Sequence, residues 1–171
     1  MSAAMLGKRI KDSSVIMTHQ MNPQDANPAG NVHGGVIMKL IDMAAGAVAA
    51  RHARANAVTA SVDRLDFHYP VFVGDLVTAR ASLNFVGRTS MEIGVRVETE
   101  NPLTGQVHHT SSAYLTFVAL DGNGRPMPLP PLIVKTGEEK RQNLEAKARR
   151  GLRLKEKRTE KAHHINPYSS A

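Results

Sequence analysis

An amide, a glycine pair and a carboxylate in the first quarter of the chain have the chemistry of a hydrolase. Asn27 begins a turn that leads to Gly34 and Gly35, and Asp42 follows in an apolar stretch. Glycines at the start of a helix leave backbone N–H groups free to stabilise an oxyanion. A partly buried carboxylate is basic enough to take a proton from water. These residue types therefore indicate hydrolysis of an activated carbonyl.

Each of these residues also has an ordinary structural interpretation. Asp42 could pair with Lys39 on the same helix face, and the glycine pair could simply permit close packing. Asn27 could be a turn residue, and Asn31 could cap the helix. The residues alone leave these alternatives open.

The spacing within this segment adds a geometric constraint. Gly35 and Asp42 are seven positions apart, which is about 10 Å along a helix axis. One bound carbonyl cannot contact both groups on the same helix. If both act, we expect a site at a dimer interface, to which two chains contribute.

Two further groups are candidates for contacting a substrate. His33 directly precedes the glycine pair, where it could cap the helix or line the site. Arg88, Thr89 and Ser90 form a polar turn that suits a phosphate or pantetheine contact, although a plain β-turn fits the same residues equally well. The eight histidines include no pair with the helical spacing of a zinc-binding helix, so no metal is expected.

One long helix and a series of strands must position these residues. A helix is predicted from near Gly34 to about Arg54, because this stretch is apolar and lacks proline. Alternation of apolar and polar residues predicts strands, one of them bulged, over 15–21, 58–67, 77–85, 91–97 and 107–119. Their short connections indicate an antiparallel meander. The expected fold class is therefore α+β, with a curved sheet wrapped around one central helix.

Charge is distributed unevenly along the 171 residues. From residue 135 onward the chain has eleven Lys and Arg against five Glu, a balance of +6, which leaves +1 of the net +7 for residues 1–134. We expect a single domain at 1–134 and a basic tail at 135–171. The tail has helix-forming composition from Glu138 to about Arg158, and we expect it to be partly disordered or docked on another subunit. Nucleic-acid binding is not favoured, because the domain itself is nearly neutral.

Composition also bears on the compartment. The chain has no cysteine, which excludes disulfides and a catalytic thiol and is compatible with a reducing cytoplasm. No apolar run approaches the roughly 20 residues of a membrane span. We expect a cytoplasmic protein without a membrane span.

Several motifs together resemble one family, the hotdog-fold acyl-CoA thioesterases, and especially the brain-type acyl-CoA hydrolases and their bacterial single-domain relatives. The resemblance extends from about Val15 to the tail after Pro131. The segments that carry it are 25–27, 30–35, 38–42, 49–52, 58–63, 90–93 and the proline-rich arm near residue 130.

The resemblance implies a particular assembly. In the brain-type enzymes two hotdog halves lie in one chain, whereas this chain resembles one half, so a homodimer with a continuous sheet should replace the fused pair. The dimers are expected to form a hexamer, with a tetramer as the alternative. The family's catalytic Asn and Asp come from opposite halves and match Asn27 and Asp42. Each dimer would then contain two sites.

The implied reaction converts an acyl-CoA and water into a fatty acid and free CoA. Asp42 would be the general base, or alternatively a nucleophile that forms an anhydride, and Asn27 would orient the water or the thioester. The N–H groups of Gly34 and Gly35 at the helix terminus, above all that of Gly35, would stabilise the oxyanion, and Phe67 would line the acyl tunnel. Substrate contacts are expected from His33, Arg88, Thr89 and Ser90. No cofactor is needed, because CoA is part of the substrate and product.

Two other functions remain open from the sequence. An acyl-thioester dehydratase or hydratase on the same fold would use His33 with a carboxylate. A non-catalytic acyl-CoA sensor would use the basic tail to bind DNA or a protein partner.

Overall fold

The computed structural model describes residues 5–164 of the chain. The chain divides into two compact units, Met1–Ile133 and Val134–Ala171. The first contains the sheet and the long helix, and the second contains one helix. Each unit is described separately.

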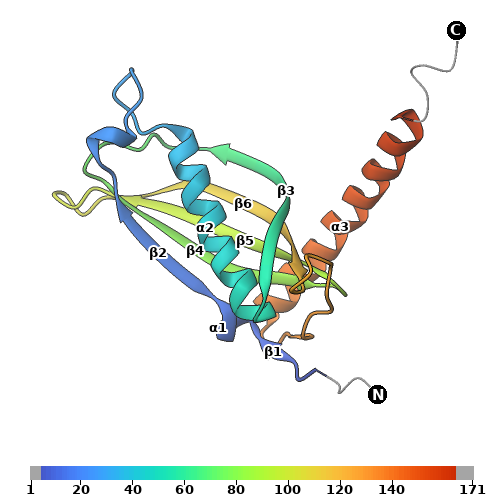
Figure 1. Cartoon of the computed structure of the whole chain (residues 1–171). Helices are drawn as coiled ribbons and strands as arrows, with labels where there is room; N and C mark the ends of the chain where they lie inside the picture. The colour runs from blue at the N-terminus through green and yellow to red at the C-terminus, as the bar shows by residue number, and fades with distance from the viewer. Residues whose placement is uncertain (1–4, 165–171) are drawn as a thin grey trace, which may run out of the picture. The chain divides into compact units, whose positions relative to one another are not determined.

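The first unit is built on a five-stranded antiparallel sheet (Figure 1). Its strands are β2 (Val15–Gln20), β3 (Asn56–Phe67), β4 (Leu76–Val86), β5 (Ser90–Glu100) and β6 (Val107–Leu120). The spatial order is β2-β4-β5-β6-β3. The expected meander is confirmed for β4 to β6 and wrong for β3, which pairs with β6 and lies at one edge of the sheet. Alternating residues identify a strand but do not specify its neighbour.

The predicted bulge in β3 is confirmed. Its register against β6 shifts between Thr59 and Ser61 and again between Val62 and Leu65. Each shift places extra residues on β3, which bends the strand and increases its twist. The bends help the sheet to curve around the helix.

The central helix, α2 (Gly34–Ala53), lies against one face of this sheet (Figure 1). Its inward side is apolar and contains small residues, which let helix and sheet approach closely. A Cβ atom on Gly46 would lie only 3.7 Å from the ring of Phe117. The fully buried α2 residues include Ile37, Ile41, Ala44, Ala45, Val48 and Ala49. They form one core with the inward residues of β4, β5 and β6.

Both ends of α2 have defined caps. His33 is the N-cap, so Asn31, the other candidate for that position, is not the cap and instead forms a bridge with Phe72. At the other end Arg54 has φ 53°, the left-handed conformation that often terminates helices. Arg51 in the last turn complements the negative end of the helix dipole.

Buried His52 forms contacts from the end of α2 to two other segments of the unit. Its Nε2–H donates to the carbonyl of Pro130 at 2.8 Å, and its Nδ1 lies 3.4 Å from the hydroxyl of Ser13. Ser13 belongs to α1 (Ile10–Ser13), which follows β1 (Lys8–Arg9), and β1 pairs in parallel with β7 (Leu132–Ile133). One imidazole therefore connects the early chain, the central helix and the proline-rich arm.

The second unit consists of α3 (Gly137–His164). Its start is a capping box in which the Thr136 hydroxyl accepts from the N–H of Glu139, while Glu139 accepts from the N–H of Thr136 and of Lys135. Arg141 pairs with Glu138 and Glu145. Across residues 5–164, no helix has the length and apolar character to cross a membrane.

Candidate active site

A pocket opens beside the N-terminal end of α2. Its volume is about 280 Å³. The residues that line it come from the loop before α2, the first turn of α2 and the segment after β3: Asn27, Asn31, Val32, Gly34, Ile37, Phe67, His68, Tyr69, Pro70 and Val71. Of the predicted site residues, the structure brings Asn27, Gly34 and Phe67 together here.

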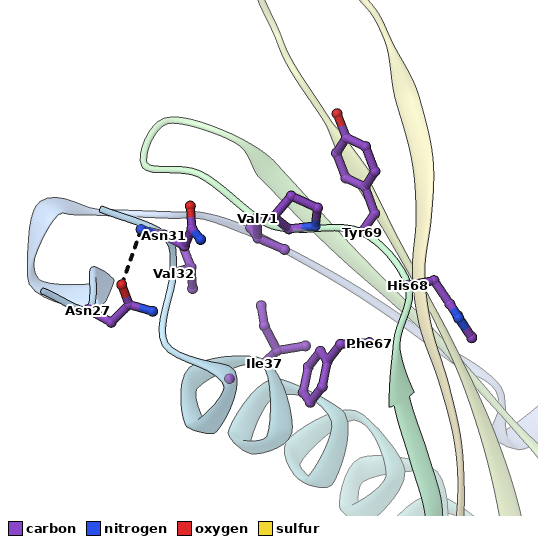
Figure 2. Close-up of a pocket in the computed structure, with 10 residues that line it drawn as sticks. Asn27, Asn31, Val32, Ile37, Phe67, His68, Tyr69 and Val71 are labelled. Atoms are coloured by element: carbon purple, nitrogen blue, oxygen red, sulfur yellow. Dashed lines mark hydrogen bonds between the residues drawn. The ribbon is translucent and has the colours of Figure 1, made fainter. Parts of the chain in front are cut away.

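The side-chain amide of Asn27 has a fixed orientation. Its Oδ1 accepts from the backbone N–H of Ala29 at 2.9 Å and of Asn31 at 3.3 Å. Backbone N–H groups need an acceptor, so the oxygen must lie on the loop side and the Nδ2 donors point away from it. Figure 2 shows the nitrogen directed from the loop toward the space beside α2. Asn27 thus offers the pocket a hydrogen-bond donor.

The Asn27 loop is closed by backbone bonds that need a glycine. The carbonyl of Asn27 accepts from Gly30, and its N–H donates to Asn31. Gly30 has φ +88°, where an L side chain would be strained. The turn therefore holds Asn27 at the pocket through both its backbone and its side chain.

The two glycines at the start of α2 have different hydrogen bonding. The N–H of Gly35 donates to Nδ1 of the N-cap His33 at 3.3 Å, so this N–H already has an acceptor within its own chain. His33 and Gly35 do not line the pocket, whereas Gly34 does. Within residues 5–164, the N–H of Gly34 has no hydrogen-bond acceptor. The donor on the pocket side of the helix terminus is thus at Gly34.

The pocket has an apolar wall. Ile37, Val32 and Val71 are buried, and half-exposed Phe67 closes one side. A Cβ on Gly34 would be 3.5 Å from the Phe67 ring, so the glycine lets the backbone and the ring lie in contact. In Figure 2 the side chains of His68 and Tyr69 point away from Ile37. The space between Asn27, Ile37 and Phe67 suits a narrow chain with one polar group.

Asp42 lies on the exposed side of α2, away from this pocket, so the partial burial expected for its carboxylate is wrong for the single chain. Its Oδ1 accepts a 2.6 Å hydrogen bond from the hydroxyl of Thr59 on β3, and this bond orients the carboxylate. Among residues 5–164, Lys39, the alternative partner, forms no ion pair with Asp42. Gly34 and Asp42 are eight positions apart, about 12 Å along the helix. The structure thus places Asn27 with Gly34 and places Asp42 with Thr59, in two separate groups.

The surface around Asp42 is apolar and borders an open sheet edge. β3 has a strand neighbour on one side only. The side chains of Val58, Val62, Met38 and Met43 near this edge are 42–52% exposed. An edge strand of 12 residues with unpaired backbone groups readily pairs with another chain.

The Arg88–Ser90 turn lies elsewhere in the protomer. It joins β4 to β5 at the end of the sheet where Ser90 pairs with Val118, whereas Phe67 at the pocket pairs with Ser111. The carbonyl of Arg88 accepts from Leu129, and that of Thr89 accepts from Ala119. None of these three residues reaches the pocket of the same chain.

Sequence reasoning missed Thr59. Thr59 is one of several polar residues that alternate with apolar ones in β3, and nothing in that pattern separates it from Ser61 or Asp63. What identifies it is the contact across to α2. The sequence does show hydroxyl residues in the strand directly after the helix. Which of them faces Asp42 depends on how β3 is aligned along α2, and the sequence does not give that alignment.

Comparison with known proteins gives the family. The thioesterase superfamily model matches residues 29–106. A Bacillus subtilis protein named as an acyl-CoA thioester hydrolase is 41% identical over 129 residues, which is 75% of each chain. The cytosolic acyl coenzyme A thioester hydrolase of Mus musculus is 41% identical over 144 residues, 83% of this chain. The chain belongs to the thioesterase superfamily, and it spans 38% of the length of the mouse enzyme.

Solved structures agree with this assignment and show the hotdog fold. A hexameric acyl-CoA thioesterase superposes with a TM-score of 0.85 at 38% identity, covering 89% of this chain and 97% of that one. An acyl-CoA hydrolase from Staphylococcus aureus, solved with butyryl coenzyme A and coenzyme A, gives 0.81 at 33% identity, covering 92% and 96%. Structures of that enzyme also exist with single Asp, Asn or Thr residues replaced by Ala.

Proposed function

We propose that this protein is an acyl-CoA thioester hydrolase whose sites form between two copies of the chain. The observation that carries the proposal is the division of polar groups around α2. Two donors, Asn27 Nδ2 and Gly34 N–H, face one pocket, and an oriented carboxylate, Asp42, lies two turns away beside an open strand edge. Each group is one half of a hydrolytic site.

The pocket half supplies the oxyanion donors. The thioester carbonyl would accept from Asn27 Nδ2 and from the N–H of Gly34 at the positive end of the helix dipole. Of the two expected oxyanion glycines, Gly34 and Gly35, the proposal uses Gly34, because the N–H of Gly35 already donates to His33. Donors that are fixed before the substrate arrives need no reorganisation as negative charge develops on the oxygen.

The carboxylate half supplies the base. Asp42 takes a proton from water, and the water oxygen attacks the carbonyl carbon. The tetrahedral intermediate then expels the CoA thiolate as the C–S bond breaks, and the proton held by Asp42 passes to the sulfur. The products are a carboxylic acid and free CoA. Thr59 keeps one Asp42 oxygen engaged, so the other is the oxygen that contacts water.

The two halves would meet by pairing of β3 with β3 of a second copy. A twofold axis at that edge brings α2 of one copy next to the first turn of α2 in the other, and it covers the exposed Val58, Val62 and Met43. Each dimer then has two sites, each with Asn27 from one chain and Asp42 from its partner. We further propose that the dimers assemble into hexamers, since relatives are described as hexameric.

The spacing of three residues in a related enzyme supports the roles proposed for Asn27, Asp42 and Thr59. The Asn, Asp and Thr replaced in the Staphylococcus aureus structures are spaced along their chain as Asn27, Asp42 and Thr59 are here. In this structure those three residues are the loop donor, the carboxylate and the hydroxyl that holds it. The mammalian relatives are named as cytosolic enzymes, which also supports a cytoplasmic location for this protein.

The direct test is release of free thiol from acyl-CoA substrates over a range of chain lengths. We expect turnover by the native protein and loss of at least two orders of magnitude in kcat for Asp42→Asn, which removes the base but keeps the shape. Lys39→Gln, on the same helix, is the matched control and should retain activity. Undiminished thiol release by Asp42→Asn would refute the assigned base, and an enoyl product without thiol would indicate a dehydratase.

Mixing inactive variants tests the shared site. Asn27→Ala and Asp42→Ala should each be inactive, and subunit exchange between them should restore activity. A mixed dimer has one site with both defects and one with neither, so up to one quarter of native activity is expected when half of the dimers are mixed. Failure to regain activity, with exchange verified by mass spectrometry, would place both residues of a site in one chain.

A further inference from the structure

One side of α3 combines three exposed leucines with basic residues. Leu144, Leu152 and Leu154 are 70%, 60% and 44% exposed. Lys140, Lys147, Lys155 and Arg158 are exposed as well. Single exposed leucines are ordinary, but leucines that gather on one side of a helix with polar residues around them indicate a surface with a partner.

Helix geometry places these seven residues together. At about 100° per residue, all seven lie within roughly 80° of the direction of Leu144. Small residues Ala148 and Gly151 lie between them. We call this set of seven residues the leucine–lysine face.

Acidic residues are excluded from the leucine–lysine face. By the same geometry, Glu138, Glu139, Glu145 and Glu156 all lie roughly 100° or more from the direction of Leu144. These are all the glutamates among residues 137–159 of the helix. Arg141 also lies within this arc, about 60° from Leu144, but it is left out of the set because it is already paired with Glu138 and Glu145. The face therefore carries four positive charges with no carboxylate to offset them.

We propose that the leucine–lysine face binds the surface of an anionic lipid bilayer, with α3 lying in the plane of the interface. Such a surface interacts favourably with both kinds of residue. The leucines enter the boundary between headgroups and acyl chains, and the basic residues contact anionic headgroups. Lysine suits this position because its long apolar stem can extend beside the leucines while its ammonium group stays in water.

Other partners match the face less well. A nucleic acid would interact with the cations through its phosphates, but it would leave the leucines in water. A second copy of the same face would bring eight positive charges together without any carboxylate. The proposal does not depend on thioester hydrolysis, and its test measures binding instead of activity.

The test is sedimentation of the full chain with phosphatidylcholine vesicles that either contain or lack phosphatidylglycerol. We expect binding only when phosphatidylglycerol is present, and weaker binding as salt is added. Each lysine near an anionic surface contributes roughly fivefold in affinity. The triple change Lys140→Gln, Lys147→Gln and Lys155→Gln should therefore weaken binding by about two orders of magnitude. Changing Leu144, Leu152 and Leu154 together to Gln should weaken it at least tenfold.

Matched controls lie elsewhere on the chain. Lys157→Gln removes a cation from another side of α3, and Leu103→Gln removes the 94% exposed leucine of the β5–β6 hairpin. Both should bind vesicles as the native protein does. Gln keeps good helix propensity, and circular dichroism checks that α3 persists.

Several results would overturn the proposal. One is equal binding, or no binding, to vesicles with and without phosphatidylglycerol. Another is salt-sensitive binding of duplex DNA that the leucine changes leave intact, since a nucleic acid would then be the partner. A third is a change in oligomeric state on replacing the leucines, measured by light scattering, because the face would then contact another subunit.

Discussion

At the scale of single residues, Thr59 controls how Asp42 presents its oxygens. The 2.6 Å hydrogen bond from the Thr59 hydroxyl engages one carboxylate oxygen and restricts rotation of the group. A hydrogen bond to a charged group is worth about 1.5–3 kcal/mol. The proposed mechanism needs the other oxygen aimed at water, so this bond is expected to matter for the rate.

We therefore predict that Thr59→Val lowers kcat by about one to two orders of magnitude, because Val has the same shape without the hydroxyl. KM should change little, since Thr59 does not line the pocket. Thr59→Ser keeps the hydroxyl and should restore most of the rate. Steady-state thiol-release kinetics check this, and a Ser variant as slow as the Val variant would argue against the hydroxyl.

At the scale of elements, the start of α2 depends on its cap. His33 accepts from Gly35 through Nδ1, and this bond fixes the first turn that presents the Gly34 N–H. Histidine is an uncommon cap, whereas Asn is among the best. Substitution of His33 alone can therefore remove this capping bond, as with Ala, or replace it with a bond to another cap side chain, as with Asn.

We predict that His33→Ala lowers the free energy of unfolding by about 1 kcal/mol and that His33→Asn largely restores it. The rate of hydrolysis should follow the same order, because the oxyanion donor belongs to the capped turn. Denaturant unfolding and thiol release on the two variants give both readouts. An Asn variant no better than Ala in either would show that the cap is irrelevant.

The far end of α2 should make stability depend on pH. Burial lowers the pKa of His52, outweighing the hydrogen bond to Pro130, and Lys8 lowers it further. At a pH just below the unfolded pKa of His52, the unfolded chain therefore binds a proton at His52 more readily than the folded chain does. The contribution of neutral His52 to stability is complete above the unfolded pKa of about 6.5 and falls as the pH drops below it.

His52→Gln should flatten this dependence between about pH 5 and pH 7, because Gln can donate to Pro130 but does not titrate. Thermal unfolding at fixed protein concentration across that range checks the slope. His19→Gln, at an exposed position on β2, is the control and should keep the native slope. An unchanged slope for His52→Gln would assign the pH dependence to other groups.

The elements also show how far sequence reasoning extends. The limits of α2 were predictable because Gly34 follows a turn and Arg54 ends an apolar run, and each strand of the sheet was predictable from its alternation. The position of β3 at the sheet edge was not, since strand order depends on packing between distant residues. The separation of the glycine pair from Asp42 followed from helix rise alone, but the Thr59 contact required the register of β3 on α2.

At the scale of the whole molecule, the two open edges of the sheet are different. β2 ends one side with exposed Ile16, and β3 ends the other with Val58 and Val62 beside Met43 of α2. Only β3 lies next to Asp42. If the sites form between two copies, dimer formation and activity both depend on the β3 edge, and neither depends on the β2 edge.

We therefore predict that Val62→Lys disrupts the dimer and abolishes hydrolysis together. Twofold symmetry would place two such lysines near each other at the paired β3 edge, and like charges there oppose pairing. Ile16→Lys puts the same charge on the β2 edge, and it should leave the sedimentation coefficient and the rate unchanged. Analytical ultracentrifugation with thiol-release assays separates the two variants. An active Val62→Lys monomer would mean that one chain contains a complete site, which the distance between Gly34 and Asp42 on α2 argues against.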